Sequence, residues 1–145
     1  MIPNPFGFSY SDDIDISEME QSIARLKRPQ GRIDVVLDTD QSEDRLNLKA
    51  IYAAPFDNHH SNGPKDGMER SYEEIFRVLA MLKKSQYEEC TYKGAEQFLD
   101  SEETPAVSAA AEHLCSLAME YTKEDPLYVI AIAACTNIAS ALLMK

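Results

Sequence analysis

The sequence predicts an α/β protein with an open, mostly parallel sheet flanked by helices. Short β-branched and aliphatic runs alternate along the chain with segments in which apolar residues recur every three or four positions. This alternation is typical of sheets whose strands are joined by helices. The clearest run, Ile33–Leu37, fits a strand buried on both faces, and two acidic residues, Asp38 and Asp40, follow it.

The chain is expected to divide just before this strand. Residues 1–32 are predicted to form an N-terminal extension with a short helix at 18–27, because Ser17 and Glu20 have capping-box spacing. Residues 33–145 are then long enough for one α/β domain with a core of its own.

A second strand is expected at Leu46–Ala54. Within it Leu48, Ala50 and Tyr52 alternate with their neighbours, so they are predicted to share one face. Only Gln41–Arg45 separate the acid pair from this strand, whereas a parallel crossover needs about a dozen residues. The first two strands are therefore either antiparallel, or parallel with the usual crossover helix missing.

Turn signals and apolar periodicity define the middle of the chain. Residues 55–67 are expected to be loop, residues 68–84 a helix, and Cys90–Tyr92 a short strand. Thr104 and Pro105 are expected to begin the next helix as its N-cap and its first residue.

The last part of the chain contains its most apolar run, Leu127–Cys135. This run predicts a central buried strand. Thr136 and Asn137 are expected to open a final apolar helix at Ile138–Met144.

The composition argues against several classes of partner. With 14 basic and 25 acidic side chains the net charge is −11, whereas nucleic acids and anionic membranes require a basic surface. The 3 cysteines are widely spaced and are expected to be buried, reduced thiols. No signal peptide is recognisable, and the longest apolar stretch is too short to span a bilayer. A cytoplasmic protein that takes a small neutral molecule or a cation fits these features.

Asp38 and Asp40 are the strongest candidate site. In open α/β sheets ligands bind beyond the carboxyl ends of the strands. Two acids there are costly to bury without a cation or a polar ligand, so a hard metal with oxygen ligands is the first hypothesis. The alternative is one turn-forming aspartate with a solvated neighbour.

The histidines are weaker candidates for a functional site than Asp38 and Asp40. His59 and His60 are adjacent in a predicted loop, where a solvated pair is favoured over a metal site. His113 lies mid-helix beside apolar positions, which favours a packing or surface role over a catalytic one.

Three segments resemble one family. D-T-D after the first strand, A-I-Y-A-A-P-F-D-N around the end of the second, and I-A-I-A-A-C-T-N-I-A-S-A-L near the end of the chain resemble the inosine–uridine-preferring nucleoside hydrolases. N-H-H-S-N-G-P-K-D-G-M-E-R-S-Y-E-E-I is similar to a subgroup of nucleoside hydrolase-like proteins. The resemblance runs from Ile33 to Lys145, with the segments in the family's order.

This resemblance implies an N-glycosidase of purine and pyrimidine salvage, which cleaves ribonucleosides with a Ca²⁺-activated water. It implies that Asp40 is a metal ligand and the general base, that Asp38 is a supporting acid, and that Thr136 gives its backbone carbonyl to the metal. Asn58 is implied to face the nucleoside. Relatives are often dimers or tetramers, so a homo-oligomer is expected.

Two departures from the family pattern imply an incomplete site. The family has two adjacent aspartates shortly after D-T-D, whereas this chain continues Q-S-E-D-R-L, as if the first helix were absent or residues between Asp40 and Ser42 were missing. The chain also ends before the family's distal aspartate and histidine, so the domain is expected to be incomplete at its C-terminus. The alternative function is a non-catalytic or truncated scaffold that acts as a binding or structural protein. The sequence does not predict a nucleobase preference.

Overall fold

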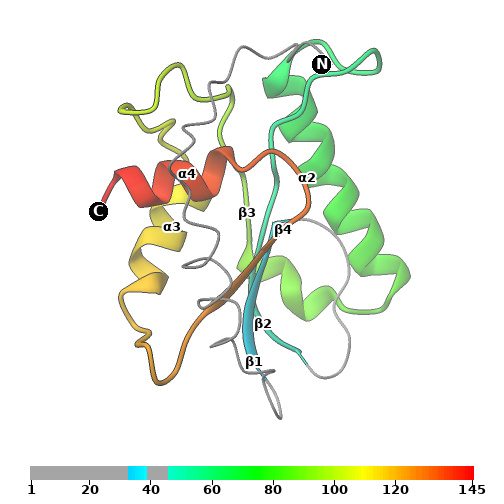
Figure 1. Cartoon of the computed structure of the whole chain (residues 1–145). Helices are drawn as coiled ribbons and strands as arrows, with labels where there is room; N and C mark the ends of the chain where they lie inside the picture. Colours follow the sequence, from blue (N-terminus) through cyan, green and yellow to red (C-terminus); the bar gives the residue numbers. More distant parts are fainter. Residues whose placement is uncertain (1–32, 39–45) are drawn as a thin grey trace, which may run out of the picture. The chain divides into compact units, whose positions relative to one another are not determined.

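The computed structural model describes residues 33–38 and 46–145, which form a parallel sheet with helices on both faces (Figure 1). The strands are β1 (Ile33–Asp38), β2 (Leu46–Tyr52), β3 (Thr91–Tyr92) and β4 (Tyr128–Ala131). Their order in the sheet is β3-β2-β1-β4, and all three pairings are parallel. The α/β architecture is therefore confirmed. The helix expected at 18–27 lies outside the described residues.

The helices cover the two faces of the sheet separately. In Figure 1 the sheet is seen edge-on, with α2 (Pro64–Met81) on one side and α3 (Ala109–Ala118) and α4 (Thr136–Leu143) on the other. A 3₁₀ helix, η1 (Ser85–Cys90), leads into β3. The core on the α2 side is built from Leu48, Ile51, Ala53, Met68, Ile75 and Leu79. The core on the α3–α4 side is built from Val36, Ala50, Tyr52, Ala110, Leu114 and Ala141.

β1 and β2 are parallel although very little chain connects them. Ile33 lies opposite Leu46 and Leu37 opposite Ile51, so the two strands run in the same direction. The antiparallel alternative is therefore wrong. Residues 39–45, which join the two strands, lie outside the described residues.

A β-bulge changes which side chains of β2 share a face. Val35 lies opposite Leu48 but Val36 lies opposite Ala50, so Lys49 is an extra residue in β2. As a result Leu48 packs in the α2-side core, whereas Ala50 packs in the α3–α4 core. The prediction that these two residues share a face is wrong, because strict alternation fails across a bulge.

Helix α2 begins earlier than the sequence pattern of 68–84 predicted. Pro64 occupies its first turn after Gly63, whose φ of 95° ends the preceding loop. Gly67, expected in a turn, is instead a buried helical residue. A Cβ atom on Gly67 would lie 1.9 Å from the carbonyl oxygen of Phe56, so the close approach of loop and helix requires glycine.

The N-cap of α3 is Ser108. Its side-chain oxygen accepts a hydrogen bond from the backbone N–H of Ala111 at 3.2 Å. The prediction that Thr104 caps this helix, with Pro105 as its first residue, is wrong. Proline fixes only its own φ angle, so it does not by itself start a helix. The helical conformation begins only after Ser108, which is also a favourable cap residue.

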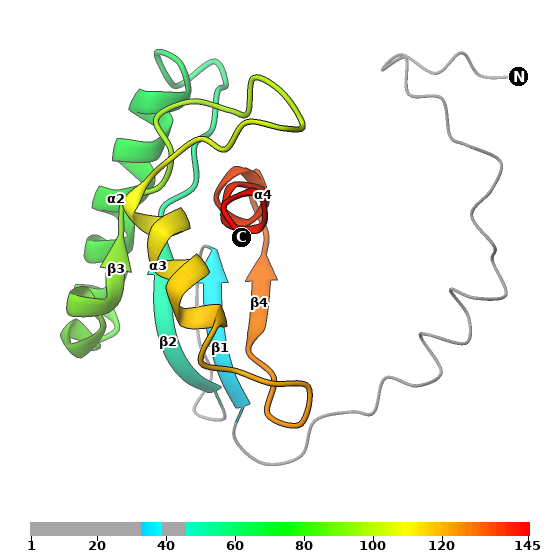
Figure 2. The ribbon, with the colours of Figure 1, turned by 90° about the vertical axis from the view of Figure 1, so that its left-hand side faces the viewer.

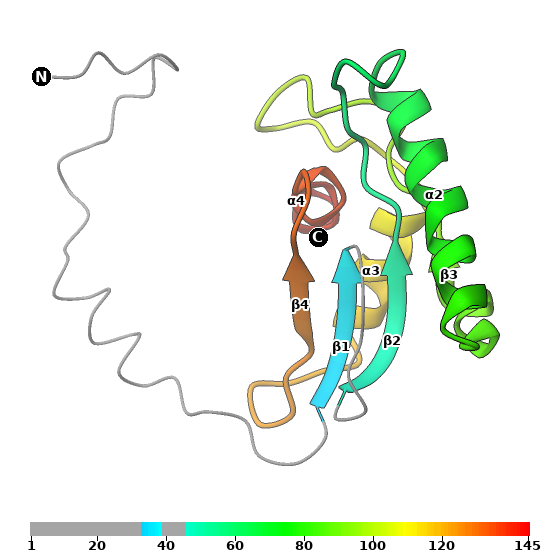
Figure 3. The ribbon, with the colours of Figure 1, turned by 90° about the vertical axis from the view of Figure 1, so that its right-hand side faces the viewer.

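The most apolar run of the chain forms an edge strand. β4 pairs with β1 alone among the described strands, and none of the described helices covers its outer side in Figures 2 and 3. Val129 is 38% exposed, Ile130 37% and Ile132 60%. The prediction that Leu127–Cys135 is a central buried strand is wrong, because apolar content does not specify a strand's position within a sheet.

The remaining features agree in part with the sequence predictions. Cys90, Cys115 and Cys135 are all free, but the first two are only half-buried and Cys135 is exposed, so the prediction that they are buried is wrong. Burial raises the pKa of the Cys90 thiol, which keeps it protonated. In the part of the chain that the structure describes, no helix combines the length and apolar character needed to cross a membrane.

We predict that Gly67→Ala destabilises the fold. Alanine normally stabilises a helix interior by about 0.5–1 kcal/mol relative to glycine. Here the new methyl group would meet the Phe56 carbonyl, and such overpacking costs about 1–3 kcal/mol. Urea unfolding should show the loss. Glu73→Ala, an exposed change in the same helix, is the control and should stay within about 0.5 kcal/mol of wild type. A stabilised Gly67→Ala protein would contradict the close contact.

Candidate functional site

The carboxyl edge of the sheet gathers most of the residues that the sequence singled out. All arrowheads in Figures 2 and 3 point the same way, and α4 begins beyond the tips of β1 and β4. Asp38 is the last residue of β1 and pairs in register with Ala131, the last residue of β4. Thr136 then begins α4, and Asn58 lies in the loop after β2. Segments distant in sequence thus reach one edge, as expected for parallel strands.

The two acids themselves cannot be placed as side chains. Asp38 is described as part of β1, but only by its backbone, and Asp40 lies outside the described residues. Their predicted roles as metal ligands, and that of Asp40 as general base, stay predictions.

Thr136 is buried at the start of α4. It is 6% exposed and follows the N-cap residue Cys135. The N-terminal end of a helix carries a partial positive charge, which disfavours a cation. A metal ion near Thr136 would therefore depend on carboxylates from the neighbouring strand end.

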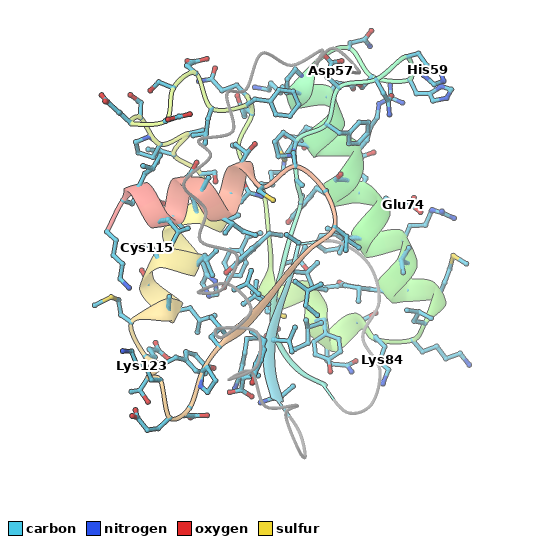
Figure 4. All side chains as sticks on the ribbon, in the orientation of Figure 1. Asp57, His59, Glu74, Lys84, Cys115 and Lys123 are labelled. Carbon is cyan, nitrogen blue, oxygen red and sulfur yellow. The ribbon has the colours of Figure 1, made fainter. Side chains whose placement is uncertain are left out.

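Asn58 lies on the surface rather than in a cavity. Its side-chain oxygen accepts the backbone N–H of His60 at 2.8 Å, and its own N–H donates to the Ser61 hydroxyl at 2.9 Å. Both bonds stabilise a local turn. In Figure 4 Asp57 and His59, on either side of Asn58, mark the outer end of this loop.

The histidines behave as solvent-exposed or packed residues. The His59 and His60 rings lie 3.8 Å apart, and both residues are exposed. No group of three or more His, Cys, Asp or Glu side chains that could hold a metal ion occurs within residues 33–38 and 46–145, side chains at the masked positions aside.

His113 is part of an aromatic cluster under α3. Its Nδ1 atom lies 2.8 Å from the hydroxyl of Tyr52, and its ring stacks on Tyr92 with 4.0 Å between centroids. Burial lowers the pKa of His113, while the nearby Glu120 opposes this shift. The packing role expected for this residue is confirmed.

A buried polar clamp lies directly behind Thr136, and the sequence analysis missed it. Asn137 is 0% exposed; its Nδ2 donates to the carbonyl oxygen of Ala53 at 3.0 Å, and its Oδ1 accepts the N–H of Ala95 at 2.9 Å. One amide thus joins α4 to the end of β2 and to the loop after β3. A Cβ on Gly94 would lie 1.9 Å from the Ala53 oxygen, so this junction is closely packed.

Ser140 adds a second clamp one turn further along α4. It is 0% exposed, and its hydroxyl accepts the backbone N–H of Ala106 at 3.1 Å. This bond holds the segment before α3 in a non-helical conformation, which accounts for the later start of that helix. Polar residues at helical spacing within an apolar helix were the sequence signal for both clamps.

A second polar cluster lies at the opposite end of β1. The Asp34 carboxylate accepts hydrogen bonds from Asn47 and from the Tyr121 hydroxyl, the latter at 2.9 Å, and lies 3.1 Å from the Lys49 ammonium. Burial, and then the Asp34 carboxylate, raises the pKa of Tyr121 to about 12. Hydrogen bonds from Tyr121, Asn47 and Lys49 lower the pKa of Asp34 despite its partial burial. Mutually satisfied groups of this kind indicate a structural role.

Two cavities of the described surface can be compared with the predicted site, and neither is lined by Thr136 or Asn58. One, of about 480 Å³, lies against α2 between Phe56 and Arg77. The other, of about 110 Å³, lies between α3, β4 and α4. The predicted ligand site therefore coincides with neither.

Comparison of the chain with known protein families, with characterised proteins and with solved structures found no significant match. The resemblance to nucleoside hydrolases therefore rests on the segments quoted above.

We predict that Asn137→Ala destabilises the protein by about 2–6 kcal/mol. The change leaves a buried N–H and a buried carbonyl without their partner, and each costs about 1–3 kcal/mol. Urea unfolding measures the loss. Asn62→Ala, at an exposed position, is the matched control and should cost less than about 0.5 kcal/mol. Equal stability of the two variants would argue against the clamp.

We predict that His113 makes stability fall as the pH is lowered through 6.5. Burial holds its folded-state pKa below the ordinary histidine value of 6.5, so the unfolded chain binds the proton first. The contribution is complete above pH 6.5 and declines below it. The free energy of unfolding of wild type and of His113→Gln should be measured between about pH 8 and pH 5.5. The difference between their slopes against pH is the contribution of His113. His59→Gln should keep the wild-type slope, and an unchanged slope in His113→Gln would refute the assignment.

Proposed function

We propose that this chain is a nucleoside hydrolase-like protein that binds a ribonucleoside at the carboxyl edge of its sheet, with a hydrolytic centre that its own residues only partly supply. The observation that supports this is topological. β1 and β4 are parallel neighbours, so the strand end carrying Asp38 lies beside the strand end that leads to Thr136.

The chemistry of the edge suits a polyhydroxylated ligand. Carboxylates accept hydrogen bonds from ribose hydroxyls, and one that is held near a cleaved glycosidic bond stabilises developing positive charge. In the proposed arrangement Asp40 is the base and Asp38 its support, while Asn58 would approach the nucleoside from the β2 loop.

Calcium is the cofactor that the resemblance implies, with Asp38, Asp40 and Thr136 as its proposed ligands. Ca²⁺ takes about six to eight oxygen ligands. The described side chains contribute no group of three metal-ligating residues, and they do not by themselves form such a shell. We therefore propose that hydrolysis by this chain alone is weak.

A non-catalytic scaffold is the second candidate, and one observation favours it. The space behind Thr136 is filled by the fully buried Asn137 and Ser140, which bond to backbone groups rather than face a ligand. These polar residues near the strand ends therefore stabilise the fold. Such a protein would bind or assemble without chemistry.

We predict weak calcium binding that depends on Asp38. Titration calorimetry of the full chain should show a heat of binding, and Asp38→Asn or Asp40→Asn should weaken it by about 10–100-fold. Asp100→Asn, which changes an exposed carboxylate in another loop, is the control with equal loss of charge. A chain that binds no calcium, or binds it equally in all variants, would overturn the proposed ligands.

The same proteins should be assayed with inosine and uridine for release of ribose. We expect turnover close to the uncatalysed background, even with saturating calcium. Ordinary turnover abolished by Asp40→Asn would show that the centre is complete and would overturn the proposal of a partial site. Absence of nucleoside binding, measured by calorimetry, would leave only the scaffold candidate.

A further inference from the structure

We propose that Asn62 and Gly63 form a site of spontaneous covalent modification, at which the Gly63 backbone nitrogen attacks the Asn62 side-chain amide and creates an isoaspartyl linkage at the start of α2. The site is independent of any nucleoside chemistry. Its support comes from the accessibility of the two reacting groups and from a contrast with two similar residue pairs nearby that the fold protects.

The reaction needs only these two residues and water. The Gly63 nitrogen forms a bond to the carboxamide carbon of Asn62, and the amide nitrogen leaves as ammonia with the proton of the Gly63 N–H, so that a cyclic imide joins the two residues. Water then opens the ring at either carbonyl. Opening at the backbone carbonyl leaves the chain running through the side-chain carbon, as isoaspartate, and opening at the other carbonyl gives aspartate.

Both reacting groups are accessible. Asn62 is exposed, and within the described part of the chain its hydrogen bond runs from the backbone N–H to the Asp66 carboxylate at 2.9 Å, which leaves the side-chain amide free to rotate. The Gly63 N–H has no acceptor among the described residues. A Cβ on Gly63 would meet nothing within 4 Å, so the carboxamide can approach the nitrogen without obstruction.

The pair Asp66–Gly67, in the first turns of α2, has the same type of sequence but not this access. The Gly67 N–H donates to the Gly63 carbonyl at 3.1 Å. Gly67 is buried, and a Cβ there would lie 1.9 Å from the carbonyl oxygen of Phe56. Its nitrogen is therefore bonded and enclosed, and the fold protects this pair.

Asn58, in the same loop as Asn62, is held in a different way. Its side-chain oxygen accepts the backbone N–H of His60 at 2.8 Å, which fixes the carboxamide. The residue that follows it is His59, whose side chain obstructs the approach to the backbone nitrogen. Asn58 is therefore an internal control with similar exposure.

The modification changes the first turn of α2. The Gly63 carbonyl accepts the first hydrogen bond of the helix, from Gly67. An isoaspartyl linkage inserts a methylene group into the backbone directly before Gly63, which displaces that carbonyl. It also leaves a carboxylate near that of Asp66, and like charges repel. We therefore expect the start of α2 to loosen.

Incubation of the full chain in mildly alkaline buffer, followed by peptide mapping with mass spectrometry, tests the site. Alkaline buffer favours the reaction because the nitrogen attacks after it loses its proton. Asn62 should be lost mainly to isoaspartate, at a rate similar to that in the urea-unfolded chain, while Asn58 of the folded chain stays intact. An Asn62 that persists in the folded chain but is lost in urea, or an Asn58 that reacts equally fast, would overturn the proposal.

Two variants separate the modification from its effect on α2. The longer side chain of Asn62→Gln closes the ring far more slowly, so this variant should keep its mass, its Tm and its hydrogen exchange at Gly67 after incubation. Incubated wild type should have a lower Tm and faster exchange at Gly67. Fresh Asn62→Asp, which carries the charge without the added backbone length, should exchange at Gly67 more slowly than incubated wild type. Converted wild type with unchanged exchange at Gly67 would contradict the loosening of α2.

Discussion

The buried amide of Asn137 is the interaction on which the arrangement of this domain depends. It joins the end of β2, the loop after β3 and the first turn of α4 through two hydrogen bonds from its side chain to backbone groups of Ala53 and Ala95. Side chains that satisfy buried backbone groups specify one packing, because alternative packings leave those groups unpaired. Together with Ser140 it fixes α4 at the carboxyl edge of the sheet. The position of Thr136 follows from this attachment.

The same attachment determines which groups surround the carboxyl edge of the sheet. Parallel strand ends and a helix N-terminus meet there, which is the usual setting for ligands in α/β sheets. Yet the polar groups immediately behind the edge are already used by the clamps, and the ligand set implied for calcium lies mostly on residues whose side chains the structure does not describe. Two cavities of the described surface lie away from this edge, one against α2 and one beside β4.

The sequence predicted the kinds of element better than their places. Apolar periodicity identified α2, and the apolar runs identified β1 and β4, because local patterns reflect local conformation. The pattern did not reveal that β4 is an edge strand, since position in a sheet depends on contacts between distant segments. It also did not reveal the bulge at Lys49, which places Leu48 and Ala50 on opposite faces of the sheet. For the site, the placement of Thr136 at the sheet edge was predictable from strand order, whereas the role of Asn137 required the positions of Ala53 and Ala95.

The short link between β1 and β2 has a consequence for how the sheet is assembled. Closing a loop costs entropy that grows with its length. Only residues 39–45 separate β1 from β2, whereas most of the described chain lies between β1 and its other neighbour, β4. The β1–β2 pair is thus the least expensive contact to nucleate, although parallel pairs are normally slow to form because of their long crossovers. The two central strands of this sheet are therefore parallel, yet they are as close in sequence as the strands of a hairpin.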